Sequence, residues 1–374
     1  MRLRAAVTIA VCLAGLPAVL HAEPLRYDWR IEDGVEYDSN PGRIERIEGN
    51  PSQPAPPASA LARLVVAGSL AADLGERNTL AASGAFGGKW FLADQARAEN
   101  VLVAQASANH TLRLWRRTQA AAAVSYYDVF QRRSTELPDF RSLLPSLRLE
   151  QGLGRAFLAS LGAGYRWFSF KPDGAYSFHA PTVFLLFRHV LPGDVLAGAA
   201  DWEWSAGGNL EARAFDGAAC TESGCDPGGS GPRHDDRFWI VHAGFARTGA
   251  WLFGAGAAMH INQSNSYGEA LVRGLLHART VVALPWEIAL SARAELVATR
   301  YRDPLTFLQP VAGLPSASIE DESRSTLRVE ISRVFAGHIE LGARYVYYTS
   351  APTSSAVDFR RHTALLYVAL LDEK

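Results

Sequence analysis

Apolar and polar residues alternate along many segments of this chain, most clearly near its C-terminal end. Successive side chains of a β-strand point to opposite faces, so alternation gives an extended segment two different faces. In segment 338–348 the apolar face is Ile339, Leu341, Ala343, Tyr345 and Tyr347, and the other face is Glu340, Gly342, Arg344 and Tyr348. A strand of this kind belongs at a boundary between an apolar medium and a polar one.

The same two-faced pattern recurs from the N-terminal part of the chain onwards. In Arg26–Asp38, only Asp33 interrupts the apolar face. Further examples are the segments 79–90, 157–167, 287–296 and 327–332. The repetition predicts an all-β chain in which one face of every strand meets an apolar medium.

Short and long connections separate these segments. The short ones carry turn residues and lie at 75–78, 116–118, 152–155, 191–194, 247–250, 283–286 and 335–338. The longer ones lie at 39–59, 92–99, 132–140, 170–178, 208–235, 263–269, 303–322 and 350–360. Fifteen such connections predict an antiparallel up-and-down arrangement of about 16 strands, an even number that lets the first and last strands pair.

Residues 1–22 have the features of a secretory signal peptide. Arg2 and Arg4 precede an apolar stretch, and small residues end the segment at Ala22. A signal-anchor helix is the alternative, but Pro17 and the short apolar length disfavour it. We therefore expect cleavage after Ala22 and one domain over residues 23–374.

The medium outside the strands is predicted to be lipid. After the signal, no apolar stretch is long enough for a membrane helix, and only a closed barrel then satisfies its backbone groups inside a bilayer. Tryptophan and tyrosine near the strand ends, such as Trp29, Trp115 and Trp286, match the aromatic girdles of such barrels. A soluble β-sandwich is the alternative, but a chain of this length would need two or three domains with linkers between them.

Charge and cysteine content exclude some functions and leave one question open. The net charge of −1 gives no footprint for nucleic acid. Cys220 and Cys225 lie in a Gly/Asp/Ser-rich stretch, where an oxidising exported environment favours a small disulfide. A metal site with the neighbouring His234, Asp235 and Asp236 is the alternative.

At this level the chain resembles a Gram-negative outer-membrane β-barrel protein of the porin-like kind. The resemblance covers nearly the whole mature chain, and the segment Tyr37–Pro41 is similar to one found after the first strand of several porin-like families. It implies outer-membrane lipid around the barrel. Because the short turns of such barrels face the periplasm, both termini are expected on the periplasmic side.

The charged faces are expected to line the lumen, where opposite charges on neighbouring strands can pair across the wall. The predicted lumen-lining residues are Arg30, Glu32, Arg148, Glu150, Arg293, Glu295, Arg328, Glu330, Glu340 and Arg344. Both signs occur, so the sequence predicts a polar channel without strong charge selectivity. The stretch 208–235 is predicted to be a long loop that either constricts the channel or extends outward.

The expected function is a conduit for hydrophilic solutes or for an exported polymer such as a polysaccharide. Aromatic residues such as Tyr127, Phe168 and Tyr348 would suit sugars, and export of a polymer would require a periplasmic partner. The alternatives are a structural or adhesive barrel of an envelope complex, and an outer-membrane hydrolase built on His234–Asp236 with His260 and Asn262. We expect no enzyme activity, no cofactor and no resident metal; the sequence does not define the oligomeric state.

Overall fold

The computed structural model describes twelve stretches of the chain, which together contain the whole barrel wall. They are residues 25–42, 46–47, 57–131, 139–154, 156–171, 173–191, 201–221, 228–249, 251–302, 325–349, 357–358 and 360–373. The predicted signal peptide and Cys225 lie outside them, so cleavage after Ala22 and the disulfide stay predictions.

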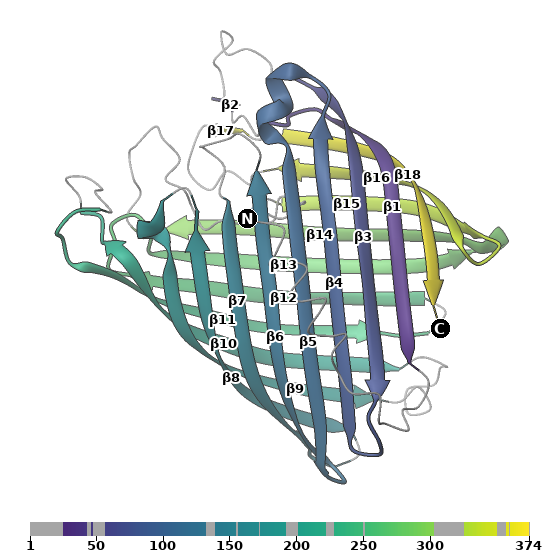
Figure 1. Ribbon diagram of the computed structural model, residues 1–374, viewed down its shortest axis with the longest axis horizontal. Coiled ribbons are helices and arrows are strands. Elements are labelled where there is room, and N and C mark those ends of the chain that lie inside the picture. Colours follow the sequence, from purple (N-terminus) through teal and green to yellow (C-terminus); the bar gives the residue numbers. More distant parts are fainter. Residues whose placement is uncertain are drawn as a thin grey trace.

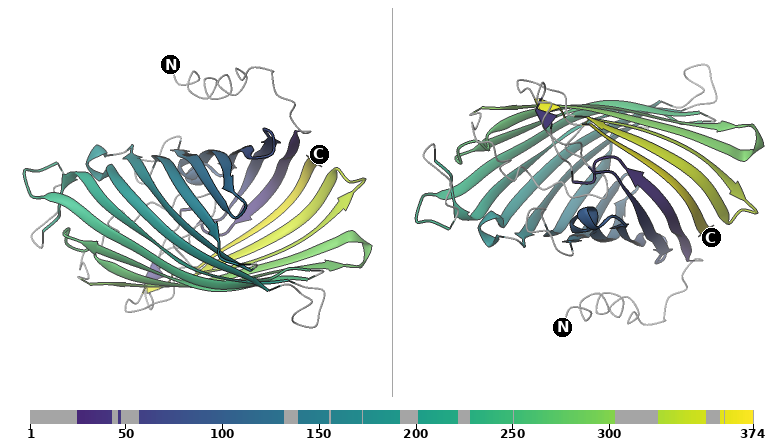
Figure 2. Two further views of the ribbon diagram at one scale, coloured as in Figure 1. Left: turned by 90° about the horizontal axis from the view of Figure 1, so that it is seen from below. Right: turned by 90° about the horizontal axis from the view of Figure 1, so that it is seen from above.

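The described residues form a closed antiparallel barrel of 16 strands, as predicted. The strands are β1 (Arg26–Asp38), β3 (Ser59–Asp73), β4 (Asn78–Phe91), β5 (Val101–Trp115), β6 (Thr118–Gln131), β7 (Phe140–Gly152), β8 (Phe157–Phe170), β9 (Phe178–Leu191), β10 (Trp202–Ala218), β11 (Arg233–Arg247), β12 (Trp251–Ser264), β13 (Leu271–Leu284), β14 (Ile288–Tyr301), β15 (Ser325–Phe335), β16 (Ile339–Thr349) and β18 (Arg360–Glu373). Each pairs with the strands before and after it, and the curved strands close into one wall (Figures 1 and 2).

The first and last strands complete the wall. β1 pairs with β18 on one side, with Asp28 opposite Glu373, and with β3 on the other, with Arg26 opposite Ala71. An ion pair of 2.9 Å joins Arg26 to Asp73, which ends β3 at a short turn. The start of β1 and the end of β18 therefore lie at the end of the barrel that carries the short turns.

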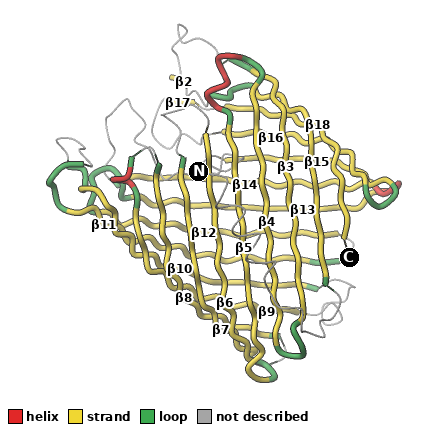
Figure 3. The backbone as a smooth tube through the Cα atoms, viewed as in Figure 1, coloured by secondary structure: helices red, strands yellow, loops and turns green. Residues whose placement is uncertain are grey.

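The opposite end of the barrel carries the longer connections. Two of them pair with each other through β2 (Arg46–Ile47) and β17 (Val357–Asp358), which form a small separate sheet. Short 3-10 helices, η1 (Asp94–Glu99) and η2 (Gly174–Tyr176), lie in two more (Figure 3). No helix in the described ranges is long and apolar enough to cross a membrane.

One predicted loop is much shorter in the structure. The prediction of a loop over 208–235 was wrong at both ends, because β10 continues to Ala218 and β11 starts at Arg233. Gly207 and Gly208 lie inside β10, where a Cβ at Gly207 would come within 2.6 Å of the Leu185 carbonyl oxygen. The glycine is needed for the close approach of β9, not for a turn.

The apolar faces point away from the barrel interior. Val35, Leu147 and Leu366 are 63%, 67% and 69% exposed, whereas the charged Glu36 and Arg344 of the other face are 2% and 7% exposed. This distribution is the reverse of that in a soluble protein, and lipid is the medium that stabilises such an outer surface. Trp115 and Trp286, both at short turns, are also highly exposed, as expected of a girdle at the bilayer surface.

Tight turns set the register at the short-turn end. Ala336 and Gly337 both have positive φ, 51° and 74°, and the His338 amide donates to the Phe335 carbonyl over 3.1 Å. Two successive left-handed residues are the signature of a type I′ turn, whose twist matches that of the flanking strands. Ala336 occupies a position that glycine or asparagine would take with less strain.

Candidate functional site

An aromatic ladder crosses five neighbouring strands near the long-loop end of the barrel. Its members are Tyr127, Phe140, Phe168, Phe178 and Phe215, on β6 to β10 in that order. Successive ring centroids lie 5.5, 5.3, 4.7 and 5.0 Å apart, and the first three contacts are stacked. These spacings are within the range of favourable aromatic pairs, so the rings stabilise one another across the strands.

The sheet register builds this ladder. Phe178 lies directly opposite Phe168 on one side and Phe215 on the other, so its ring meets a ring from each neighbouring strand. Phe215 also stacks on the imidazole of His234 in β11, with centroids 3.8 Å apart and planes 4° from parallel. The ladder therefore ends against a polar side chain.

Charged groups lie beside the ladder. Glu211 accepts hydrogen bonds from Arg166 and Arg213, at 2.8 and 2.6 Å. The Arg213 guanidinium also lies over the rings of Phe178 and Phe238, at 5.1 and 4.0 Å from their centroids. Cation–π contacts and the shared carboxylate hold both arginines in fixed positions.

A cavity of about 750 Å³ opens in front of these residues. Phe140, Phe168 and Phe178 line it together with Arg166, Glu211 and Arg213, and its remaining wall includes Ser69, Ser83, Ser107, Ser125 and Gln105. Apolar ring faces next to a few fixed donors and acceptors are the usual lining of a ligand-binding site. The arrangement suits a ligand with flat apolar patches and many hydroxyl groups.

A second arc of the wall, the charged arc, contains a continuous ion-pair network. Its members come from five strands: Arg30, Glu32 and Glu36 from β1, Arg63 from β3, Lys89 from β4, Glu330 from β15, and Glu340 and Arg344 from β16. Arg344, for example, pairs with Glu330 at 2.9 Å and with Glu32 at 3.3 Å. Buried charges need such partners, because an unpaired one would be costly to keep out of water.

Tyr367 of β18 lies at the centre of the charged arc. Its hydroxyl is 2.7 Å from a Glu330 oxygen and 2.9 Å from a Glu340 oxygen, and the Arg344 guanidinium lies 5.3 Å from the ring centre. The ring covers Gly342, where a Cβ would come within 2.2 Å of the tyrosine Cζ. Gly342 thus makes room for the ring that connects the two carboxylates.

Every predicted lumen-lining residue has an oppositely charged partner in the structure. The pairs are Arg30–Glu32 at 3.1 Å, Arg148–Glu150 at 3.0 Å, Arg293–Glu295 at 3.2 Å, Arg328–Glu330 at 2.7 Å and Arg344–Glu330 at 2.9 Å, with Arg30 also paired to Glu340. Several pairs join residues two apart on one strand rather than on neighbouring strands. These charged side chains are therefore paired with one another in the structure, and their contact with a passing solute is a proposal.

The predicted hydrolase residues adopt a different arrangement from a catalytic triad. His234 and Asp236 lie together, but Asp235 is exposed. Asp236 Oδ1 and Ser264 Oγ lie 2.8 and 3.2 Å from the same His234 nitrogen, Nε2. A Ser–His–Asp relay needs its serine and its aspartate on opposite ring nitrogens. Ser264 and Asp236 therefore do not form such a relay with His234.

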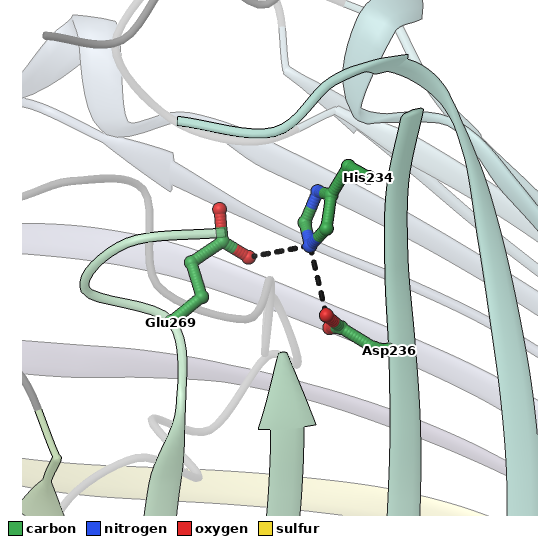
Figure 4. A group of neighbouring side chains, drawn as sticks. All are labelled: His234, Asp236 and Glu269. Atoms are coloured by element: carbon green, nitrogen blue, oxygen red, sulfur yellow. Dashed lines mark hydrogen bonds and ion pairs between the residues drawn. The ribbon is translucent and has the colours of Figure 1, made fainter. Parts of the chain in front are cut away.

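The same group is a candidate metal site within the described ranges. Glu269, from the connection between β12 and β13, brings a carboxylate oxygen to 3.4 Å from His234 Nε2 (Figure 4). The ligand atoms of His234, Asp236 and Glu269 all lie within 4.8 Å of one another. Burial raises the pKa of Glu269 above its ordinary value. The sequence did not suggest Glu269, because thirty or more residues separate it from the histidine.

Sequence reasoning also missed most of the aromatic ladder. It singled out Tyr127 and Phe168 for sugars, but not Phe140, Phe178 or Phe215. The alternation of Glu211, Arg213 and Phe215 with alanines was a usable strand signal. The predicted loop over 208–235 concealed it. Tyr348, the third ring suggested for sugars, instead lies on β16 beneath the Arg361 guanidinium, 5.2 Å from its ring centroid.

The closed barrel, its lipid-facing apolar surface and its polar interior define the class: an outer-membrane β-barrel of porin-like architecture. Among solved structures, OprB of Pseudomonas putida matches with a TM-score of 0.53 and 10% identity over 93% of this chain and 94% of that one. OpdQ of Pseudomonas aeruginosa matches with a TM-score of 0.48 and 9% identity over 93% and 98%. At such identity the likeness to OprB shows the fold alone. No protein-family model matches the chain, and no curated protein matches its sequence.

Proposed function

We propose that this barrel is a conduit for hydrophilic solutes and that saccharides are the solute class it favours. The observation that carries the proposal is the cavity that exposes Phe140, Phe168 and Phe178 next to the Arg166–Glu211–Arg213 group. A sugar ring has apolar C–H faces, which can pack on aromatic rings, and hydroxyls, which can hydrogen-bond to charged groups. Both kinds of partner lie within one wall here.

The charged arc has a supporting role in this proposal. Its arginines and glutamates balance each other, so it gives the lumen a wet polar surface without a ring of one charge sign. The proposed lumen-lining residues, among them Arg30, Glu340 and Arg344, would stiffen the wall and form hydrogen bonds with a passing solute and its water. The lumen then discriminates little between cations and anions.

The proposed setting is the outer membrane, with the short turns and both termini in the periplasm, as is usual for such barrels. A polysaccharide passing outward is the polymer form of the same proposal. Its repeated sugar rings would meet the ladder in succession, and a periplasmic partner would have to deliver the chain.

Liposome swelling with matched variants tests the saccharide preference. Phe168→Leu removes a ladder ring while keeping a large apolar side chain. Phe187→Leu makes the same change on the outer face of β9, where the ring is 47% exposed. We expect Phe168→Leu to slow swelling in maltotriose more than in a zwitterionic solute of similar size, and Phe187→Leu to leave both unchanged. Equal rates for Phe168→Leu and the original protein would contradict the saccharide assignment, even if both conduct.

A further inference from the structure

Three oxygen atoms converge on a single nitrogen at the end of the aromatic ladder. Asp236 Oδ1, Ser264 Oγ and Glu269 Oε2 lie 2.8, 3.2 and 3.4 Å from His234 Nε2. An imidazole nitrogen carries at most one hydrogen, so it donates fully to only one of them. Several atoms able to ligate a metal, brought together in a buried place, form a geometry that can bind a cation.

Two of the separations between these atoms are close to those around a small metal ion. Zn–N and Zn–O bonds of about 2.0–2.2 Å in a tetrahedral site place neighbouring ligand atoms about 3.3 Å apart. The distances of 2.8 and 3.4 Å from His234 Nε2 to the two carboxylates lie on either side of that value. Small movements of the Asp236 and Glu269 side chains would open room for the ion.

A buried amide supports two members of this group. Asn262 is only 4% exposed, and its Oδ1 atom has no hydrogen-bond partner in the described part of the chain. Its Nδ2 donates to Asp236 Oδ2 at 2.9 Å and to the Glu269 carbonyl at 3.0 Å. The amide therefore holds the Asp236 carboxylate and the Glu269 backbone in fixed positions.

We propose that His234, Asp236 and Glu269 bind a divalent transition-metal cation such as Zn²⁺, with the Asn262 amide holding Asp236 in position. One nitrogen and carboxylate oxygens suit this class of metal better than Ca²⁺, which takes oxygen ligands only. The ion would attach the connection between β12 and β13 to the start of β11. It would thereby fix His234, on which the last ring of the ladder stacks.

Isothermal titration of the folded, chelator-treated protein in detergent with Zn²⁺ tests this site. We expect one Zn²⁺ per chain, with proton release that depends on the ligands giving up protons. Glu269→Gln should weaken binding at least about tenfold. Glu76→Gln, at an exposed short turn, is the matched control and should leave the affinity unchanged.

A second measurement separates this site from the neighbouring cysteines and from misfolding. The double variant Cys220→Ser/Cys225→Ser should keep the Zn²⁺ site. In urea unfolding, Zn²⁺ should raise the midpoint of the original protein and of the cysteine variant but not that of Glu269→Gln, because a ligand that binds only the folded state stabilises it. The proposal is overturned if the folded protein binds no Zn²⁺, if Glu269→Gln binds equally well, or if binding requires the cysteines. The first two outcomes would indicate that a protonated His234 bridges the two carboxylates instead.

Discussion

The contact between Gly342 and Tyr367 gives a sharp prediction for stability. A Cβ added at Gly342 would lie 2.2 Å from Cζ and 2.3 Å from the hydroxyl of Tyr367, so Gly342→Ala must push the ring away. The ring then loses its hydroxyl contacts with Glu330 and Glu340 and its position under the Arg344 guanidinium. The hydroxyl carries one hydrogen and donates to one carboxylate at a time, so the ring loses one hydrogen bond to a charged group, about 1.5–3 kcal/mol, and one cation–π contact, about 0.5–1 kcal/mol. Together these predict a loss of about 2–4 kcal/mol.

Urea unfolding in lipid vesicles, followed by tryptophan fluorescence, measures this loss. Gly274→Ala is the matched control, because no described atom lies within 4 Å of a Cβ added there, and it should be neutral or slightly stabilising. In a Tyr367→Ala background the clash is gone, so Gly342→Ala should cost almost nothing. A loss of less than about 0.5 kcal/mol in the original protein, or an equal loss in both backgrounds, would refute the reasoning.

Three further predictions concern charge pairs, turn strain and selectivity. Glu36→Gln removes the buried carboxylate that Lys89 and Arg63 contact at 2.9 and 3.3 Å, and should destabilise the barrel by about 3–5 kcal/mol in the same urea assay. Asp94→Asn breaks an exposed pair with Arg97 and should cost less than about 0.5 kcal/mol. Similar losses of stability in the two variants would contradict the burial argument. Ala336→Gly relieves the positive φ of 51° and should stabilise by about 1 kcal/mol, and a lower urea midpoint would argue against the turn assignment. Arg166→Gln leaves Glu211 with one arginine fewer at the cavity, so reversal potentials in a salt gradient should shift toward cations; no shift would place this group outside the ion path.

The strand pattern was readable because one physical rule applies to every strand. Lipid on one side and water on the other impose period-two alternation, and β1 was predicted with the bounds that the structure has. The error at 208–235 arose where the rule has an exception. Gly207 and Gly208 normally suggest a turn, but here they provide space between tightly packed strands.

The site was less predictable, because its contacts depend on register across strands. Phe140, Phe168 and Phe178 are 28 and 10 residues apart in the sequence, and only the pairing of β7, β8 and β9 brings their rings together. Glu269 likewise reaches His234 from a neighbouring hairpin. Alternation indicates which face of the wall a side chain occupies, but not its position along the barrel axis. The ladder rings, and Glu269 with His234, are neighbours because they lie at the same level along that axis.

Single-channel recording in a planar bilayer tests the central claim most directly, that the barrel interior is a path for hydrophilic solutes. We predict stepwise, ohmic conductance from the folded barrel in potassium chloride, and a current that falls in a concentration-dependent way when maltotriose is added. Folding of the same sample is verified by its β-sheet circular dichroism. Folded, inserted barrels that show no conductance would contradict the account.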